Sequence, residues 1–313
     1  MFEAIKRLID KYSCIIIHRH KSPDGDAMGS QQGLRRILID NYPEKTVYAV
    51  GDMTPTYKFM DDPAMDIIPD EVYEGALAII LDSSAKGLIS DERYALADAT
   101  ARIDHHLFVE KIADEEVYDT SFESCCGLIT AMAMECGWKV APEAAKALYT
   151  GMVTDSGRFR YDCTNSRTFT LAAFLMDKGF GTEDIYRNLY SVDLALSQLR
   201  AKYALKINTI PEGVAYIYTT LDEAKEYGFD NFTLSRAMVN VMGDIKGIDI
   251  WANFTETESG ILCELRSNKY NINPIAVKYG GGGHKKASGA TLKSKDEAMA
   301  MIEDLKLIPE EQK

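Results

Sequence analysis

The first half of the chain alternates short apolar runs with segments whose apolar residues recur at helical spacing. The apolar runs predict four strands, at 13–18, 46–50, 76–81 and 101–103. The other segments predict helices at 27–39, 125–136, 142–154 and 167–178. Gly137 and Gly179 are placed to end two of these helices. This alternation is typical of a doubly wound α/β fold, in which helices cover both faces of a parallel sheet.

The pattern changes after residue 182, where a long helical stretch is interrupted at Ser191-Val192-Asp193. Beyond it, strands are predicted at 214–219, 248–255 and 260–266, with helices at 234–242 and 274–279. We therefore expect three parts along the chain. They are a parallel-sheet domain over residues 1–185, a helical linker over 186–207 and a smaller α+β domain over 208–313.

Composition limits the classes of protein that fit this pattern. The chain has 313 residues, of which 46% are apolar, enough for a core in each of two domains. Its formal charge of −13 argues against a basic surface for long duplex nucleic acid, but it permits a short phosphorylated substrate in a local pocket. No apolar run approaches the ~20 residues of a membrane helix, and a signal-peptide pattern is missing. We expect a cytoplasmic protein whose six cysteines are reduced.

All five histidines fall in three short stretches beside Asp or Gly: His18 and His20, His105 and His106, and His284. Histidine is the commonest metal ligand and titrates near neutral pH. Two of these stretches directly follow predicted strands, and so does Asp82. Because ligands of open α/β sheets bind outside the carboxyl ends of the strands, we expect these residues to converge on one site.

The first stretch ends in a tight Pro-Asp-Gly-Asp loop that carries Asp24 and Asp26. Gly25 permits the sharp turn, and the two carboxylates with His20 form an oxygen-rich site for a divalent cation. An imidazole ligand shifts the preference from Mg²⁺ toward Mn²⁺, Fe²⁺, Co²⁺ or Zn²⁺. The same residues also fit a solvated Asx turn in which Asp26 caps the next helix.

The other stretches also allow two interpretations each. Asp104-His105-His106 is a specific pattern, although one histidine could be exposed and the other satisfied in the core. Asp155 closes a predicted helix and is followed by Arg158, which fits either a glycine-containing turn or a metal ligand beside a phosphate contact. Gly280 to Gly283 offer consecutive backbone N–H groups for an anion-binding nest, or a flexible hinge.

Taken in order, these motifs resemble the DHH phosphoesterase family in its two-domain form, which has a DHH-associated carboxyl-terminal domain. The matching residues are His18-Arg19-His20, Pro23 to Ala27 with Gly29-Ser30, Asp104-His105-His106, and Leu265-Arg266-Ser267 with Gly280 to His284. The similarity covers essentially the whole chain. The nearest branch is that of the bacterial nanoRNase/pAp phosphatases.

The resemblance implies two divalent ions, usually Mn²⁺, with Mg²⁺ and Co²⁺ as alternatives. One ion would be bound by His20, Asp24 and Asp82, and the other by Asp26, Asp82, His105 and Asp155. The four aspartates carry four negative charges, which two divalent ions would offset. The resemblance also places Asp104 and His106 in the catalytic centre, with His106 at the scissile phosphate. Substrate binding falls to His106, Arg158, Arg266, Ser267, Gly281, Gly282, Gly283 and His284.

The implied activity is hydrolysis of single-stranded RNA a few nucleotides long to 5′-mononucleotides, and of pAp to AMP, by hydroxide that two metal ions activate. The alternative within the family is a cyclic or linear dinucleotide phosphodiesterase. A pyrophosphatase is disfavoured by the glycine run with His284, and a processive exonuclease by the short acidic chain. A nucleotide sensor without turnover is the alternative from another class. The sequence leaves the oligomeric state open, a homodimer included.

Overall fold

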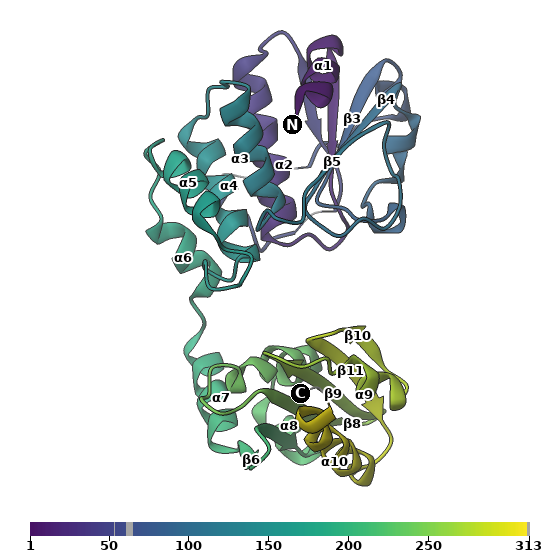
Figure 1. Cartoon of the computed structure of the whole chain (residues 1–313), viewed down its shortest axis with the longest axis vertical. Coiled ribbons are helices and arrows are strands. Elements are labelled where there is room, and N and C mark those ends of the chain that lie inside the picture. Colours follow the sequence, from purple (N-terminus) through teal and green to yellow (C-terminus); the bar gives the residue numbers. More distant parts are fainter. Residues whose placement is uncertain (53, 61–64, 312–313) are drawn as a thin grey trace. The chain divides into compact units, whose positions relative to one another are not determined.

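A computed structural model describes residues 1–52, 54–60 and 65–311, and it divides the chain into two compact units, Met1–Ser191 and Val192–Lys313 (Figure 1). The predicted linker, 186–207, comprises the end of α6 (Glu183–Tyr190), the break at 191–193 and α7 (Leu194–Leu205). Leu199 and Tyr203 of α7 are buried in a core of the second unit. Within the described ranges, none of the helices combines the length and apolarity that a membrane crossing requires.

The first unit is built on a parallel sheet with the strand order β2-β1-β3-β4-β5. Its strands are β1 (Cys14–His18), β2 (Thr46–Ala49), β3 (Ala76–Leu81), β4 (Ala99–Asp104) and β5 (Glu115–Tyr118). The four predicted strands are confirmed. β5 was not predicted, because Glu-Glu-Val-Tyr has neither an apolar run nor a clear alternation. The strand order reverses beside β1, so the carboxyl ends of β1, β3 and β4 adjoin a switch point.

The two faces of this sheet are covered differently. Ile15, Ile17 and Ile79 belong to the large core beneath the α-helices. These helices are α1 (Glu3–Lys11), α2 (Gly25–Asn41), α3 (Cys125–Glu135), α4 (Pro142–Asp155) and α5 (Ser166–Met176). On the opposite face, Ile16 and Ile80 pack on residues of the 3₁₀ helices η1 (Asp70–Tyr73) and η3 (Glu92–Leu96). Helices thus cover both faces, but on one face they are only short turns.

A close contact between α2 and α4 determines where the site forms. α2 carries Gly25, Gly29 and Gly33 at four-residue spacing on the side that contacts α4. A Cβ added to Gly29 would lie 2.5 Å from the carbonyl oxygen of Ala147, so only glycine fits there. The contact brings the first turn of α2, with Asp26, beside the last turn of α4, with Asp155.

The second unit contains a mixed sheet with the strand order β10-β11-β9-β8-β7-β6, in which only β7 and β8 are parallel. The strands are β6 (Asn208–Ile210), β7 (Val214–Thr219), β8 (Ile250–Thr257), β9 (Gly260–Ser267), β10 (Gly282–His284) and β11 (Ala287–Leu292). The helices are α7, α8 (Leu221–Tyr227), α9 (Asn273–Lys278) and α10 (Lys295–Glu311). The helix predicted at 234–242 is a π-helical segment (Thr233–Ala237) followed by a 3₁₀ turn (Val239–Met242).

Candidate functional site

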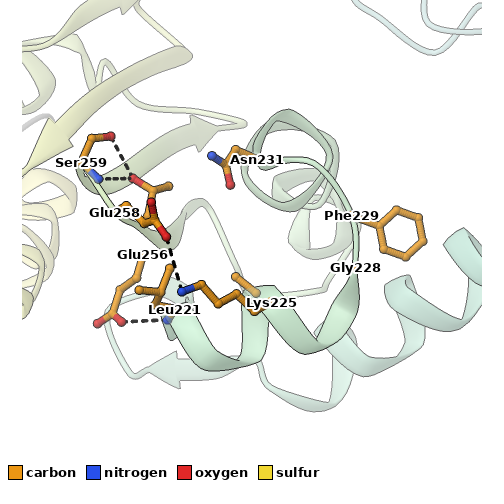
Figure 2. A pocket seen from close by; sticks show the side chains of 10 residues that line it. Leu221, Lys225, Gly228, Phe229, Asn231, Glu256, Glu258 and Ser259 are labelled. Carbon is orange, nitrogen blue, oxygen red and sulfur yellow. Dashed lines mark hydrogen bonds and ion pairs between the residues drawn. The ribbon is translucent and has the colours of Figure 1, made fainter.

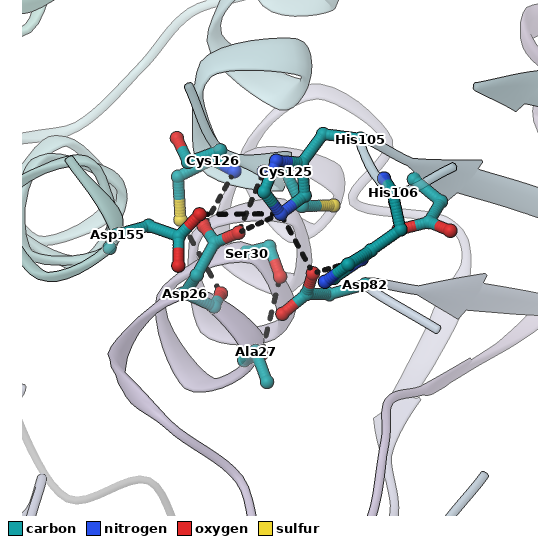
Figure 3. A network of polar contacts seen from close by, with 12 residues as sticks. Asp26, Ala27, Ser30, Asp82, His105, His106, Cys125, Cys126 and Asp155 are labelled. Carbon is teal, nitrogen blue, oxygen red and sulfur yellow. Dashed lines mark hydrogen bonds and ion pairs between the residues drawn. The ribbon is translucent and has the colours of Figure 1, made fainter. Parts of the chain in front are cut away.

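The carboxyl ends of β1, β3 and β4 bring most of the predicted metal ligands of the first unit together. Figure 3 shows Asp26, Asp82, His105 and Asp155 pointing toward one another, with His106 beside Asp82. A cavity of about 230 Å³ opens onto this cluster. It is lined by His20, Asp24, Asp82, His106 and Asp155, together with Ser84 and Leu88, which sequence analysis did not single out.

The donor atoms form three groups whose members lie within 4.8 Å of one another. The groups are His20 with Asp24 and Asp82, Asp26 with His105 and Asp155, and Asp82 with His105 and His106. Asp82 occurs in two of them. Its carboxylate lies 3.4 Å from His20 Nε2 and 3.5 Å from His105 Nε2. These separations exceed a hydrogen bond of about 2.7–3.2 Å, and they suit ligands that each lie about 2.0–2.2 Å from a shared cation.

Asp82 has the geometry of a shared ligand. Its φ of +50° turns the chain sharply after β3, and its amide donates to Ile103 at 3.1 Å. The side chain is buried, and its Oδ1 has no hydrogen-bond partner among the described residues. Burial opposes ionisation, but His105 and His20 outweigh it and lower the pKa of Asp82. A buried, ionised oxygen between two imidazoles fits a bridging metal ligand.

Asp26 is held by the start of α3. Its two oxygens accept hydrogen bonds from the backbone N–H groups of Cys125 and Cys126, at 2.7 and 2.9 Å. Ser124 caps the helix and accepts from Gly127 at 2.9 Å. Sequence analysis missed this support because backbone amides carry no residue signature. The positive end of the helix fixes the orientation of the carboxylate.

Nearby positive charge compensates Asp26 and Asp155 only in part. Burial, followed by the charges of Asp82 and Asp155, raises the pKa of Asp26 well above its usual range. Burial also raises the pKa of Asp155 to about 7, although the nearby His105 opposes the rise. Divalent cations would offset these like charges, so the donor set fits a metal centre.

The helix cap differs from the one considered from the sequence. Asp24 begins α2, and its Oδ1 accepts from the amides of Asp26 and Ala27, each at 3.0 Å. The interpretation in which Asp26 caps this helix is therefore wrong. Asp24 combines capping with a place 3.7 Å from His20 Nε2, and Asp26 is left to point at His105.

His106 is half-exposed at the cavity and is oriented by Asp104. Its Nδ1 lies 2.8 Å from Asp104 Oδ1, and this bond raises the pKa of His106 despite partial burial. Asp104 in turn accepts from Arg102, and both are fully buried. Sequence analysis missed Arg102, because a polar residue in a short strand does not reveal which face is buried.

Two residues of the first unit lie outside this cluster of ligands. His18 is fully buried between the rings of Tyr73 and Tyr94, and burial lowers its pKa to about 4, so it is a neutral core residue. Arg158 is exposed, and its guanidinium lies 4.6 Å from the ring centre of Tyr190.

The second unit brings part of the predicted substrate-binding set together. Arg266, Gly282, Gly283 and His284 line one hollow of about 300 Å³, to which Arg236 also contributes. Gly281 lines an adjacent hollow of about 360 Å³. Ser267 lines neither of them: its Oγ donates to Asp249 at 2.9 Å and accepts from Tyr270 at 2.7 Å, which stabilises a turn.

The glycine run is not a nest of four free amides. The N–H groups of Gly280 and Gly281 donate to Val277 and Ala276 at the end of α9, so the prediction is wrong for these two. The following residues form β10, which pairs with β11. A Cβ on Gly281 would lie 2.0 Å from the carbonyl oxygen of Gly289. Close backbone packing, rather than anion binding, explains glycine at this position.

Comparisons with known proteins agree with this organisation. The profile of the DHH family, N-terminal domain, matches residues 14–152, and that of the DHHA1 domain matches residues 213–309. The bifunctional oligoribonuclease and PAP phosphatase NrnA of Bacillus subtilis (strain 168) is 35% identical over 308 residues, or 97% of each chain. A probable protein of that name from Streptococcus mutans is 34% identical over 97% of this chain and 98% of its own. An exopolyphosphatase-related protein from Bacteroides fragilis superposes with a TM-score of 0.84 at 26% identity, covering 97% of this chain and 95% of its own.

Proposed function

The chain belongs to the DHH family and is a phosphoesterase with a DHHA1 domain, and from this premise we propose that it hydrolyses very short oligoribonucleotides to 5′-mononucleotides and pAp to AMP. The relatives named above as oligoribonuclease and PAP phosphatase, which align over nearly their whole length, support this choice of substrates. Short substrates also suit an acidic chain, because affinity for long nucleic acid depends on neutralising many phosphates.

The observation that carries the proposal is the position of Asp82, which forms one donor group with His20 and Asp24 and a second with His105 and His106. His105 also belongs to the group that contains Asp26 and Asp155. We propose that these groups bind two divalent ions, with Mn²⁺ preferred because imidazole and carboxylate ligands are mixed. Bound ions would supply Lewis-acid activation of water and would stabilise the charge that develops on the phosphoryl group.

The remaining roles belong to side chains of the protein. His106, whose pKa is raised and whose ring is oriented by Asp104, would donate a hydrogen bond to a nonbridging oxygen or a proton to the leaving oxygen. The hollow lined by Arg266 and His284 in the second unit would bind a nucleotide. Asp104 acts through His106, since it is buried and bonded to it.

A substrate panel tests the proposal. Oligoribonucleotides of graded length, pAp, linear and cyclic dinucleotides and pyrophosphate are incubated separately with Mn²⁺, Mg²⁺ or Co²⁺, and the products are identified. We expect mononucleotides from the shortest RNAs, AMP from pAp, and no product in excess EDTA. Preferred hydrolysis of cyclic dinucleotides would support the alternative phosphodiesterase. Hydrolysis of pyrophosphate alone, or nucleotide binding without turnover, would contradict the proposal.

A further inference from the structure

The 300 Å³ hollow of the second unit is built on three adjacent strands, β9, β11 and β10. The register forms two rows across them: Arg266, Ala287 and His284 in one, and Glu264, Gly289 and Gly282 in the other. These residues share a face because they alternate along each strand. The small residues in the middle leave the space, and charged or polar side chains stand around it.

The charges around this hollow are not all compensated. Arg266, the cation predicted from the sequence, is bound to Glu264, since Nη1 lies 3.0 Å from its carboxylate. Arg236 lines the same hollow, and in the described part of the chain it forms no ion pair. Its guanidinium lies 5.7 Å from the ring centre of Phe232. Arg236 is therefore the cation with charge available to a ligand.

The backbone that carries Arg236 is fixed by a buried side chain. Arg236 lies in the π-helical segment Thr233–Ala237, a form that is rare in proteins and frequent at functional sites. Asn253 on β8 is fully buried and donates to the carbonyls of Leu234 and Ser235, at 2.8 and 2.6 Å. Asn253 pairs with Glu264 in the sheet register. The segment is thus anchored directly beside the hollow.

A second hollow in the same unit provides a contrast. This hollow, of about 560 Å³, lies beside α8, and Figure 2 shows Lys225, Glu256 and Glu258 among the residues that line it. Lys225 lies 3.5 Å from Glu258, and Glu256 accepts from the amide of Leu221 at 2.8 Å. The two carboxylates outnumber the lysine, so this larger hollow does not favour an anion.

We propose that Arg236 is a further substrate-binding residue. Its guanidinium would bind a phosphate group of the nucleotide other than the one that is hydrolysed. A guanidinium presents parallel N–H groups that match two phosphate oxygens. The inference rests on the proposed function, since it takes a short nucleotide as the ligand. It also distinguishes Arg236 from Arg266, whose charge Glu264 already offsets.

The test measures binding rather than turnover. Full-length wild type, Arg236→Ala and Arg236→Lys are titrated with 5′-AMP and with adenosine by calorimetry, in EDTA so that no metal ion binds the phosphate. The matched control is Lys225→Ala, which removes a cation from the larger hollow. We expect Arg236→Ala to weaken AMP binding by about 10- to 100-fold and to leave adenosine binding unchanged. Arg236→Lys should be intermediate and Lys225→Ala should match wild type.

Kinetics supply the second measurement. Arg236→Ala should raise KM for 5′-phosphorylated dinucleotides and leave kcat and the KM for unphosphorylated dinucleotides unchanged. The inference is overturned if wild type does not prefer AMP to adenosine. It is also overturned if Arg236→Ala leaves the affinities for AMP and adenosine unchanged, or changes both by the same factor. If AMP binding depends on Arg236 but no substrate of the panel is hydrolysed, Arg236 still binds a nucleotide phosphate, and only the proposed hydrolysis fails. If the panel is hydrolysed but Arg236→Ala binds AMP as wild type does, only the inference fails.

Discussion

One carboxylate oxygen of Asp104 contacts two nitrogen atoms of His106, one in the ring and one in the backbone. The Nδ1 atom of His106 lies 2.8 Å from Asp104 Oδ1, and the His106 backbone N–H donates to that oxygen at 3.3 Å. The bond fixes the ring and leaves Nε2 as the nitrogen available to a ligand. Because Arg102 binds the other oxygen, the carboxylate cannot turn away without losing a buried ion pair.

We therefore expect Asp104→Asn to lower kcat by ~100-fold or more with little change in KM, because the amide neither orients nor charges His106 in the same way. Steady-state kinetics on a trinucleotide with saturating Mn²⁺ measure both constants. A rise in KM with an unchanged kcat would show instead that Asp104 serves binding.

A double variant separates this effect from loss of structure. Asp104→Asn leaves the buried Arg102 without its closest partner, and breaking such a pair costs about 3–5 kcal/mol. Arg102→Met combined with Asp104→Asn removes both charges and should recover part of the melting temperature. Its kcat should stay as low as that of Asp104→Asn. Recovery of kcat together with stability would assign Asp104 a purely structural role.

If Asp155 is a metal ligand, Asp155→Asn should change how strongly Mn²⁺ raises the melting temperature. Without metal, burial raises the pKa of Asp155 to about 7, and the charge of Asp82 acts in the same direction, so a neutral side chain at this position removes an unfavourable buried charge. We expect the metal-free variant to melt at or above the wild-type temperature, and Mn²⁺ to raise its melting temperature less than that of wild type. Scanning fluorimetry in EDTA and in Mn²⁺ measures both.

The control for this experiment is Asp162→Asn, which removes an exposed carboxylate seven residues further along the chain. It should respond to Mn²⁺ as wild type does. An Asp155→Asn protein with the full Mn²⁺ shift would exclude Asp155 as a ligand.

The cluster of candidate metal ligands in the first unit could be predicted because its position depends on short stretches of sequence. His20, Asp82 and His105 each follow a strand, and in a parallel sheet that position fixes which edge they share. The supports of the cluster could not be predicted in this way. Arg102 is polar but fully buried, and the amides of Cys125 and Cys126 reach Asp26 across about a hundred residues of sequence.

The carboxyl-terminal unit was harder to predict because its irregular elements depend on tertiary contacts. β10 consists of Gly-Gly-His, which has no strand propensity and pairs only because β11 lies beside it. The π-helical segment depends on Asn253, a residue far from it in sequence. Arg236 therefore could not be identified from a motif.

Because α2 packs closely on α4, we expect a glycine-to-alanine substitution in α2 to destabilise the protein, which is the opposite of the usual effect. Replacing glycine by alanine inside a helix normally stabilises it by about 1 kcal/mol. Gly29→Ala would instead place Cβ 2.5 Å from the carbonyl oxygen of Ala147 and 2.9 Å from Cys126 Sγ, so we expect a loss of about 1–3 kcal/mol. Because α2 also carries Asp26, displacement of the helix should weaken Mn²⁺ binding.

Urea unfolding and Mn²⁺ titration of the full chain measure the two effects. The control is Gly87→Ala in the 3₁₀ turn Lys86–Leu88, where an added Cβ meets nothing within 4 Å. Its free energy of unfolding should stay within about 0.5 kcal/mol of wild type. If Gly29→Ala is as stable as this control and binds Mn²⁺ normally, the contact between α2 and α4 does not set the position of Asp26. A loss of stability without a loss of Mn²⁺ affinity would confine the role of Gly29 to packing.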